Sequence, residues 1–421
     1  MNQVARAPLS FGQLSVWRSI EHLSPDRAAS VNLARTWDLP DDCTVDSVRT
    51  ALEVLTERHE SLRTRYAESG PRGIEQVICR PARLPIATYE LGVEAEERAS
   101  DVTVRLAKDA IALDTVHPWR VGIVTQAGRP RHLALVIHHL AADSAAIAVA
   151  NREFIGLLGG VAPADPAPRC RDVAVEQHSS AWAMRRAASL DYWKRVTEAA
   201  PPAAAGPTAI STARWATLRS MPVTIGTERL AARLNISAQS VLYAAYCRTL
   251  ADSMQQDRFL VGLLASNRVA TRWRNLVSSM NQLVPVLVRM RPGEDFASLA
   301  TRLYAESLAA YRYGCYDVDA LAQIEARTGY NGAGRGFHSF FNFIPSAEGA
   351  VSPPVDSEDP DAWTVTTRDH GRDNGFPFYL VIDGGRPVVC TLRVGSAPDY
   401  EPLRDFLLRL QQLIVTAAMR E

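Results

Sequence analysis

The stretch HLALVIHHLAADSAAIAVA, residues 132–150, joins an apolar run to two adjacent histidines and then to an aspartate. Apolar residues that alternate along its first half predict a β-strand, and helical spacing begins at Asp143. Because successive side chains of a strand point to opposite faces, His138 and His139 cannot serve the same purpose. We expect one imidazole to lie under the sheet and the other to face the opposite layer or a channel.

The flanking sequence extends this reading to a mixed α/β fold. Residues 118–140 contain two apolar runs joined by AGRP, which predicts a β-hairpin whose second strand carries the histidines. Residues 45–66 place Val48, Leu52, Leu55 and His59 at helical spacing, so we expect an amphipathic helix there. The run IEQVICR that follows is typical of a strand.

The second half of the chain has the same mixture of elements. Residues 227–254 predict two helices that are separated at NIS, with Ser237 as the N-cap of the second. RFLVGLLASNR and NQLVPVLVRM predict two buried strands that flank a polar loop. Residues 376–394 predict a hairpin around DGGR, and residues 401–419 predict a closing amphipathic helix. Residues 345–361 predict a long loop.

Composition limits the classes of protein that the chain can represent. The 421 residues are 47% hydrophobic and 22% charged, enough for two domains of about 200 residues each. The 46 basic residues balance the 46 acidic residues, so we expect no nucleic-acid partner. The N-terminus lacks the core of a signal peptide and no apolar run reaches membrane length, which predicts a cytoplasmic protein without membrane contact. Six dispersed cysteines predict reduced thiols rather than a metal site or disulfides.

Taken alone, the two histidines and the aspartate leave two interpretations open. A neutral histidine at the end of a strand can accept a proton from an attacking amine or alcohol, but a hydrogen-bonded pair in the core has the same sequence. Asp143 is also well placed to cap the next helix. The sequence contains no GxSxG, no phosphate-binding GxxxxGK[ST] loop and no HExxH.

A family resemblance separates these interpretations. HHLAADS resembles the HHxxxDG signature of the condensation domains of nonribosomal peptide synthetases, in the chloramphenicol acetyltransferase-like superfamily. LSFGQLSVW resembles the first family motif, with Ser10, Gln13 and Trp17 in place, and residues 58–66, RHESLRTRY, resemble the second. Further similar segments follow in order: RDVAVEQHSSAW with DYWKR, GLLASNR, SSMNQLVPVLVRM and FHSFFNF. The resemblance covers nearly the whole chain.

The resemblance implies an α/β fold with two chloramphenicol acetyltransferase-like lobes. In the family these lobes form a V-shaped pseudo-dimer with a tunnel between them, and donor and acceptor enter from opposite faces. By this resemblance, residues 1–175 form the N-terminal lobe that carries the histidines, and residues 176–421 form the C-terminal lobe. An Ala/Pro/Gly-rich segment near residues 199–209 is the expected inter-lobe linker.

The resemblance also implies a role for each residue of the site. His139 is the expected catalytic residue, which takes the proton of the nucleophile or orients the nucleophile, and His138 shapes the site beside it. Asp143 is expected to be structural and to pair with Arg268 of ASNR. An aspartate that an arginine keeps ionised is better suited to holding a loop than to competing for a proton.

Two positions depart from the family pattern. Ser144 stands where the family has glycine, and SSMN lacks the usual glycine and phenylalanine before Asn281. Ser144 and Asn281 are therefore candidates for the lining of the substrate tunnel. The Ser144 hydroxyl can narrow the tunnel, bond to substrate or only extend the helix cap.

The expected function is a condensation-type acyltransferase in the biosynthesis of nonribosomal peptides or related specialised metabolites. It joins a thioester on a carrier protein to an amine, or less readily to a hydroxyl. We expect a monomer with no bound cofactor and no metal, which meets the phosphopantetheine arm of a peptidyl or acyl carrier protein and a small-molecule acceptor. With no adenylation or carrier motif in it, the chain is expected to be free-standing or excised from a synthetase.

Three alternatives remain. The first is a catalytically silent domain that recruits a partner enzyme or carrier protein. The second is a stand-alone O-acyltransferase with a coenzyme A or carrier-bound acyl donor. The third is an epimerase-like relative that uses the same histidines on an α-carbon.

Overall fold

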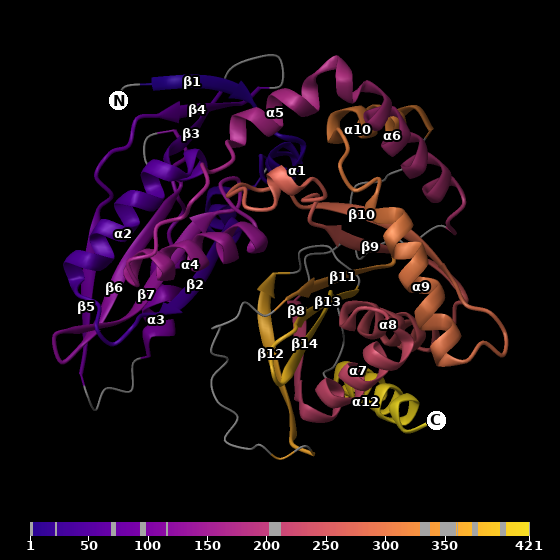
Figure 1. The fold of residues 1–421 in the computed structure, drawn as a ribbon. Coiled ribbons are helices and arrows are strands. Elements are labelled where there is room, and N and C mark those ends of the chain that lie inside the picture. Colours follow the sequence, from indigo (N-terminus) through magenta and orange to yellow (C-terminus); the bar gives the residue numbers. More distant parts are fainter. Residues whose placement is uncertain are drawn as a thin grey trace. The chain divides into compact units, whose positions relative to one another are not determined.

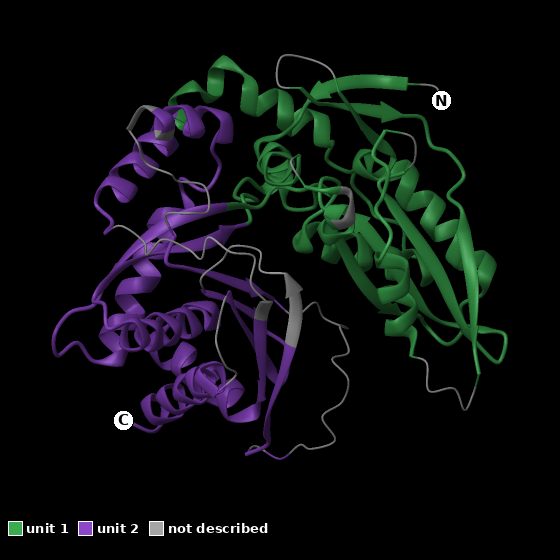
Figure 2. Ribbon diagram, turned by 180° about the vertical axis from the view of Figure 1, so that it is seen from behind, with its two compact units in different colours: residues 1–186, 266–282 green, residues 187–265, 283–421 purple. Residues whose placement is uncertain are grey.

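The structure is a computed structural model in which the chain forms two compact units (Figure 2). Unit 1 contains residues 1–186 and 266–282, and unit 2 contains residues 187–265 and 283–421. The described residues are 3–21, 23–68, 73–92, 98–114, 117–201, 212–328, 337–345, 359, 361–372, 378–395 and 401–420.

Unit 1 contains two sheets (Figure 1). The smaller has the strand order β1-β4-β3, and all its pairs are antiparallel. Its strands are β1 (Gln3–Pro8), β3 (Thr64–Ala67) and β4 (Glu75–Cys79). The larger has the order β2-β7-β6-β5, in which only the pair at the β5 edge is parallel. Its strands are β2 (Asn32–Asp38), β5 (Ile86–Leu91), β6 (Trp119–Gln126) and β7 (Arg129–His138).

Helices cover both faces of the larger sheet of unit 1. The α-helices are α1 (Phe11–Ile20), α2 (Val45–Arg58), α3 (Ala99–Ala107), α4 (Ser144–Leu158) and α5 (Cys170–His178). Short 3-10 turns are η1 (Pro25–Val31), η2 (Glu60–Arg63), η3 (Ser180–Trp182) and η4 (Thr271–Trp273). One core joins α2 and α4 to the face of β7 that presents Leu133, Leu135 and Ile137. The other face, which includes Ala134, packs against α3.

Unit 2 is built on one seven-stranded sheet with the order β10-β9-β11-β13-β14-β8-β12. Strand β11 is parallel to β9 and β13, whereas the pairs from β13 to β12 are antiparallel. The strands are β8 (Thr212–Ser220), β9 (Arg258–Ala265), β10 (Gln282–Arg289), β11 (Ser339–Ile344), β12 (Trp363–Arg372), β13 (Phe378–Asp383) and β14 (Val388–Val394).

A second core lies between this sheet and the helices of unit 2. The helices are α6 (Ala183–Glu198), α7 (Met221–Leu234), α8 (Ala238–Met254), α9 (Phe296–Tyr311), α10 (Val318–Thr328) and α12 (Glu401–Met419). Helix α8 is buried along most of its length, and its N-terminus begins at the Ser237 cap, whose side chain accepts the Ser240 N–H. Over the part of the chain that the structure describes, no helix has the length and apolarity to cross a membrane.

The main predicted elements are confirmed. The hairpin predicted over residues 118–140 is β6–β7, and IEQVICR contains β4. The helix predicted over residues 45–66 is shorter than expected: α2 ends at Arg58, and η2 and the strand β3 follow it. The helices predicted around NIS are α7 and α8, and the DGGR hairpin is β13–β14. Of the loop predicted over residues 345–361, residues 346–358 and 360 lie outside the described residues.

The compact units divide the chain differently from the predicted lobe boundary at residues 175/176. Unit 1 continues to Arg186 and also includes residues 266–282 from the second half of the chain. The returning segment packs on unit 1: Val277 belongs to its core, and Arg268 is ion-paired to Asp143. In the predicted linker near 199–209, residues 202–209 lie outside the described residues.

Candidate active site

The edge of the candidate site is the end of β7. His138 is the last residue of this strand and pairs with Asn32 of β2. The His138 N–H donates to the Pro118 carbonyl at 2.8 Å, and the His139 N–H donates to the Val31 carbonyl at 3.1 Å. Main-chain bonds to two different segments therefore fix the two histidines at the point where the sheet ends.

His138 is buried, and its ring bonds to its own turn. Its Nδ1 accepts the Leu140 N–H at 3.1 Å, so the neutral ring carries its proton on Nε2. Burial, and secondarily the neighbouring His139, lowers the pKa of His138 to about 3. This ring is consequently neutral at physiological pH, and it holds the turn that leads to Asp143.

His139 has a different environment and is only half-buried. Its Nδ1 lies 3.0 Å from the Ala142 carbonyl oxygen. A carbonyl can only accept, so Nδ1 must be the protonated nitrogen of the neutral ring. The lone pair then resides on Nε2. Ser279 Oγ lies 3.5 Å from the same Nδ1, as a second and longer contact.

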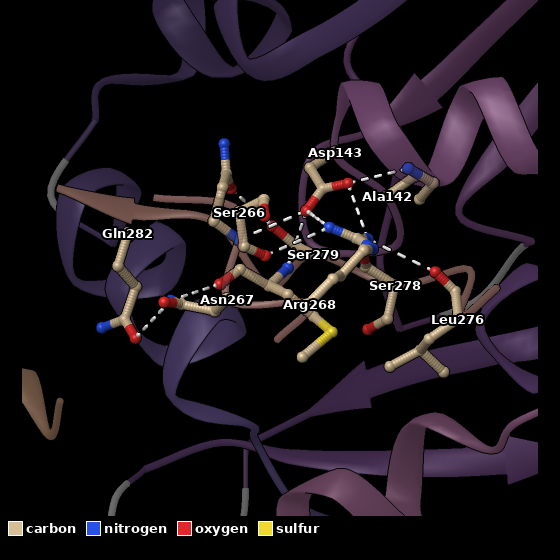
Figure 3. Close-up of polar contacts among 12 residues, drawn as sticks. Ala142, Asp143, Ser266, Asn267, Arg268, Leu276, Ser278, Ser279 and Gln282 are labelled. Atoms are coloured by element: carbon tan, nitrogen blue, oxygen red, sulfur yellow. Dashed lines mark hydrogen bonds and ion pairs between the residues drawn. The ribbon is translucent and has the colours of Figure 1, made fainter. Parts of the chain in front are cut away.

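Asp143 connects the start of α4 to the returning segment 266–282 (Figure 3). It is the N-cap of α4, and its Oδ1 accepts the Ala146 N–H at 2.8 Å. Arg268 binds both carboxylate oxygens at 2.8 Å. The backbone N–H groups of Met280 and Asn281 donate to Oδ2 at 2.9 and 3.2 Å. One carboxylate therefore accepts five hydrogen bonds.

The charge of Asp143 is stabilised despite its burial. Burial alone raises the pKa of this carboxyl group, but the charge and hydrogen bonds of Arg268, with the N–H groups of Met280 and Ala146, outweigh it and lower the pKa. Arg268 in turn donates to the carbonyls of Ser278 at 2.9 Å and Leu276 at 3.3 Å. The pair thereby holds a loop in a fixed shape, and the structure contains the Asp143–Arg268 pair that the family resemblance implied.

Helix α1 supports the same loop from another direction. Ser10 Oγ donates to the Ser279 carbonyl at 3.4 Å. At Gly12 a Cβ atom would lie 2.5 Å from Met280 Cα and 2.7 Å from the Ser279 carbonyl oxygen. Only glycine permits the main chains of α1 and the loop to approach so closely. The glycine of LSFGQLSVW therefore has a packing role.

A buried polar network holds the turn between His139 and Asp143. The Leu140 carbonyl accepts the Tyr66 hydroxyl at 3.0 Å and Gln13 Nε2 at 3.4 Å. Gln13 also forms a capping box with Ser10 at the start of α1. Two sequence motifs far apart in the chain, LSFGQLSVW and RHESLRTRY, thus meet behind the histidines.

The two predicted tunnel candidates lie on either side of the aspartate. Ser144 is the first residue of α4 and is partly buried. The Asn281 N–H bonds to Asp143, and its Oδ1 accepts Ser279 Oγ at 3.4 Å. The structure brings both residues to the Asp143 site, and contact with substrate stays a prediction.

Sequence reasoning missed several groups of the site. The Ala142 carbonyl fixes the His139 tautomer, and Ser279, Gly12 and Tyr66 position the surrounding backbone. For Gly12, Tyr66 and Ser279 a signal existed, because all three lie inside quoted motifs. A backbone carbonyl carries no signal in the sequence. Among the described residues, no group of three or more His, Cys, Asp or Glu side chains could hold a metal ion.

The described residues combine a mixed α/β fold with a strand that ends in two histidines and with a buried aspartate–arginine pair, as the family resemblance implies. The chain belongs to the condensation-domain family, whose model matches residues 5–350. This family acts on substrates that carrier proteins present on phosphopantetheine. The family resemblance and the acyltransferase class predicted from the sequence are confirmed.

Relatives support the assignment. The chain is 21% identical over 338 residues to a polyketide synthase–nonribosomal peptide synthetase, pyiS, of Pyricularia grisea, a match that covers 75% of this chain and 8% of the relative. It is 25% identical over 320 residues to the phosphinothricin tripeptide synthetase PhsC of Streptomyces viridochromogenes, covering 70% of this chain and 29% of the relative. The chain thus spans a small part of these curated relatives.

The fold is also that of solved condensation domains. The condensation domain of the monacolin K polyketide synthase MokA matches with a TM-score of 0.82 and 16% sequence identity, and the match covers 100% of this chain and 99% of that one. At this identity the likeness concerns the fold.

Proposed function

We propose that this chain catalyses the transfer of an acyl group from a carrier-protein thioester to an amine, with His139 as the general base. The observation that carries the proposal is the bond from His139 Nδ1–H to the Ala142 carbonyl, because it leaves Nε2 free to accept a proton. The half-buried position of the ring keeps it accessible to a substrate.

The chemistry requires one base and no covalent enzyme intermediate. The amine nitrogen attacks the thioester carbonyl carbon, and Nε2 of His139 takes the proton that this nitrogen loses. The C–S bond breaks as the C–N bond is completed, and the proton passes from His139 to the departing thiolate. General base catalysis of this kind contributes about 10²–10⁴-fold.

The other residues keep His139 in place. Asp143 is already saturated by Arg268 and three backbone N–H groups, so it does not compete for the proton. His138, with its pKa lowered to about 3 by burial and by His139, stays neutral and serves the turn. We assign these residues to positioning.

The test is an acyl-transfer assay with a loaded carrier protein or a pantetheine thioester mimic and a panel of amines and alcohols. We expect His139→Ala to lower the rate of product formation by about 10²–10⁴-fold. His132→Ala is the matched control, because it removes a partly exposed histidine from β7, the strand that precedes His139. Equal rates for His139→Ala and the native chain would refute the assignment.

The same assay separates the alternatives. Ester products from alcohols, with no amide from any amine, would assign an O-acyltransferase. Retained binding of the carrier without any product would assign a recruiting domain. Exchange of an α-proton for deuterium in the thioester, with no transfer, would assign epimerase-like chemistry.

A further inference from the structure

Unit 1 contains a second pocket, with a volume of about 420 Å³, that includes none of the residues of the histidine site. It lies where β3 and β4 come close to the segments that precede β5 and β6. The basic side chains of its lining come from both sets of elements: Arg63, Arg65, Arg80, Arg83, His117 and Arg120. Among the residues that the structure describes, no carboxylate side chain lines it.

Among the described residues, none of the five arginines of this pocket forms an ion pair, although the charge of Arg63 acts on the Glu60 carboxyl group. Arg63 donates to the Cys79 carbonyl at 2.6 Å, Arg65 to the Asp114 carbonyl at 3.3 Å, and Arg120 to the Ala110 carbonyl at 2.8 Å. The Nε atom of Arg65 is buried without a hydrogen-bond partner. Backbone carbonyls therefore orient the guanidinium groups of these three arginines without removing their charge.

The buried Glu60 interacts with the charge of Arg63, but its ion pair at 3.2 Å is with Arg171, and burial raises the pKa of its carboxyl group. His117 adds no charge near neutral pH, because burial lowers its pKa. The positive potential of the pocket thus comes from arginine and persists across the physiological pH range.

The floor of the pocket has a different character. Leu84, Ile111 and Trp119 are buried apolar side chains that contribute to the lining. A cavity of this size matches the range in which small molecules bind. Cations at the rim and an apolar floor together favour a ligand with an anionic group and an apolar body. Guanidinium groups bind phosphate through paired hydrogen bonds.

We propose that the pocket between Arg65, Arg80, Arg83 and Arg120 binds a phosphate ester with an apolar body. The ligand is either a free phosphorylated small molecule or a pantetheine-bearing coenzyme that binds through its phosphate. The pocket is close in the fold to the histidines, because Trp119 of its floor pairs with Ile137 one residue before His138. The proposal does not depend on the proposed acyl transfer.

The test is calorimetric titration of the whole chain with phenyl phosphate, at low salt. We expect saturable binding of phenyl phosphate, and at least tenfold weaker binding of both inorganic phosphate and phenol. The double substitution Arg80→Glu with Arg83→Glu should weaken phenyl phosphate binding at least tenfold. Both side chains are exposed, so this variant should keep the native unfolding temperature.

Arg129→Glu is the matched control, since Arg129 is an exposed arginine of the same unit at the far end of the β6–β7 hairpin. It should bind phenyl phosphate like the native chain. Competition by coenzyme A but not by pantetheine would assign the coenzyme as the source, and absence of competition would assign a free phosphate ester. Phenol binding as tightly as phenyl phosphate, binding unaffected by the double substitution, or no saturable binding would overturn the proposal.

Discussion

Replacing Asp143 by asparagine should destabilise unit 1 far more than the loss of one hydrogen bond. The substitution keeps the shape of the side chain but removes the charge that faces Arg268, whose side chain is 7% exposed, as against 2% for Asp143. It also puts an NH2 group where a carboxylate oxygen accepts several N–H groups. An unpaired buried charge of this kind costs about 3–5 kcal/mol.

The expected loss can be converted to a temperature. For a unit of about 200 residues, each 1 kcal/mol lowers the unfolding temperature by about 2–4 °C, so Asp143→Asn should lower it by about 6–20 °C. Calorimetry measures the transition, and hydrogen exchange of the peptides that contain residues 143–146 and 278–282 locates the loss. Exchange should accelerate in both peptides, because the carboxylate joins them.

The matched control is Asp41→Asn, which breaks the ion pair of Asp41 with Arg131 in the same unit. Asp41 is 90% exposed, and such pairs contribute about 0–1 kcal/mol. A change below about 1 kcal/mol in Asp143→Asn, equal to that of the control, would refute the reasoning.

The pH dependence of unfolding provides a second measurement. The folded-state pKa of Asp143 is lowered, so its stabilisation is present above the ordinary carboxyl pKa of about 3.9 and is lost as the pH falls toward the folded-state value. Asp143→Asn should lack this part of the acid dependence.

Three further predictions concern the groups around the histidines. Gly12→Ala should destabilise unit 1 by about 1–3 kcal/mol in urea unfolding, because the new methyl group overlaps Met280. Its control is Gly159→Ala, whose Cβ atom would lie no closer than 3.5 Å to any neighbour and which should change the free energy of unfolding by less than about 1 kcal/mol. Tyr66→Phe removes the hydroxyl that donates to the Leu140 carbonyl and should cost about 1–2 kcal/mol; a calorimetric scan that matches the native chain would contradict this. The His138 ring should stay neutral in an NMR titration down to about pH 4, because burial and His139 lower its pKa to about 3. The same ring in the unfolded chain titrates near 6.5, so the free energy of unfolding should fall as the pH falls from about 6.5 toward 3. His138→Asn should lack this loss.

The parts of the fold that follow local rules were accessible from the sequence. The β6–β7 hairpin is encoded by its two apolar runs and the AGRP turn, in which Ala127 and Gly128 adopt positive φ. The caps at Asp143 and Ser237 precede helical spacing and begin α4 and α8. These elements are determined by interactions between residues that are close in the sequence.

The parts that depend on distant contacts were not accessible in the same way. The pair Asp143–Arg268 was predicted from family resemblance, since 125 positions separate its members and no local pattern links them. Which ring nitrogen of His139 carries the proton depends on the direction of the Ala142 carbonyl, and backbone dihedral angles set that direction. The return of residues 266–282 to unit 1 also escaped prediction, because a division by sequence order assigns them to the second half.

That returning segment has a consequence for biosynthesis of the protein. At about 5–20 residues per second, synthesis reaches residue 282 roughly 5–20 s after residue 186, the end of the first part of unit 1. Until then the nascent chain carries Asp143 without Arg268 and α1 without the loop that covers Gly12. The first 186 residues should therefore expose an unfinished surface to chaperones and proteases on the ribosome. A chain truncated there should be recovered only when residues 266–282 are supplied as a separate peptide.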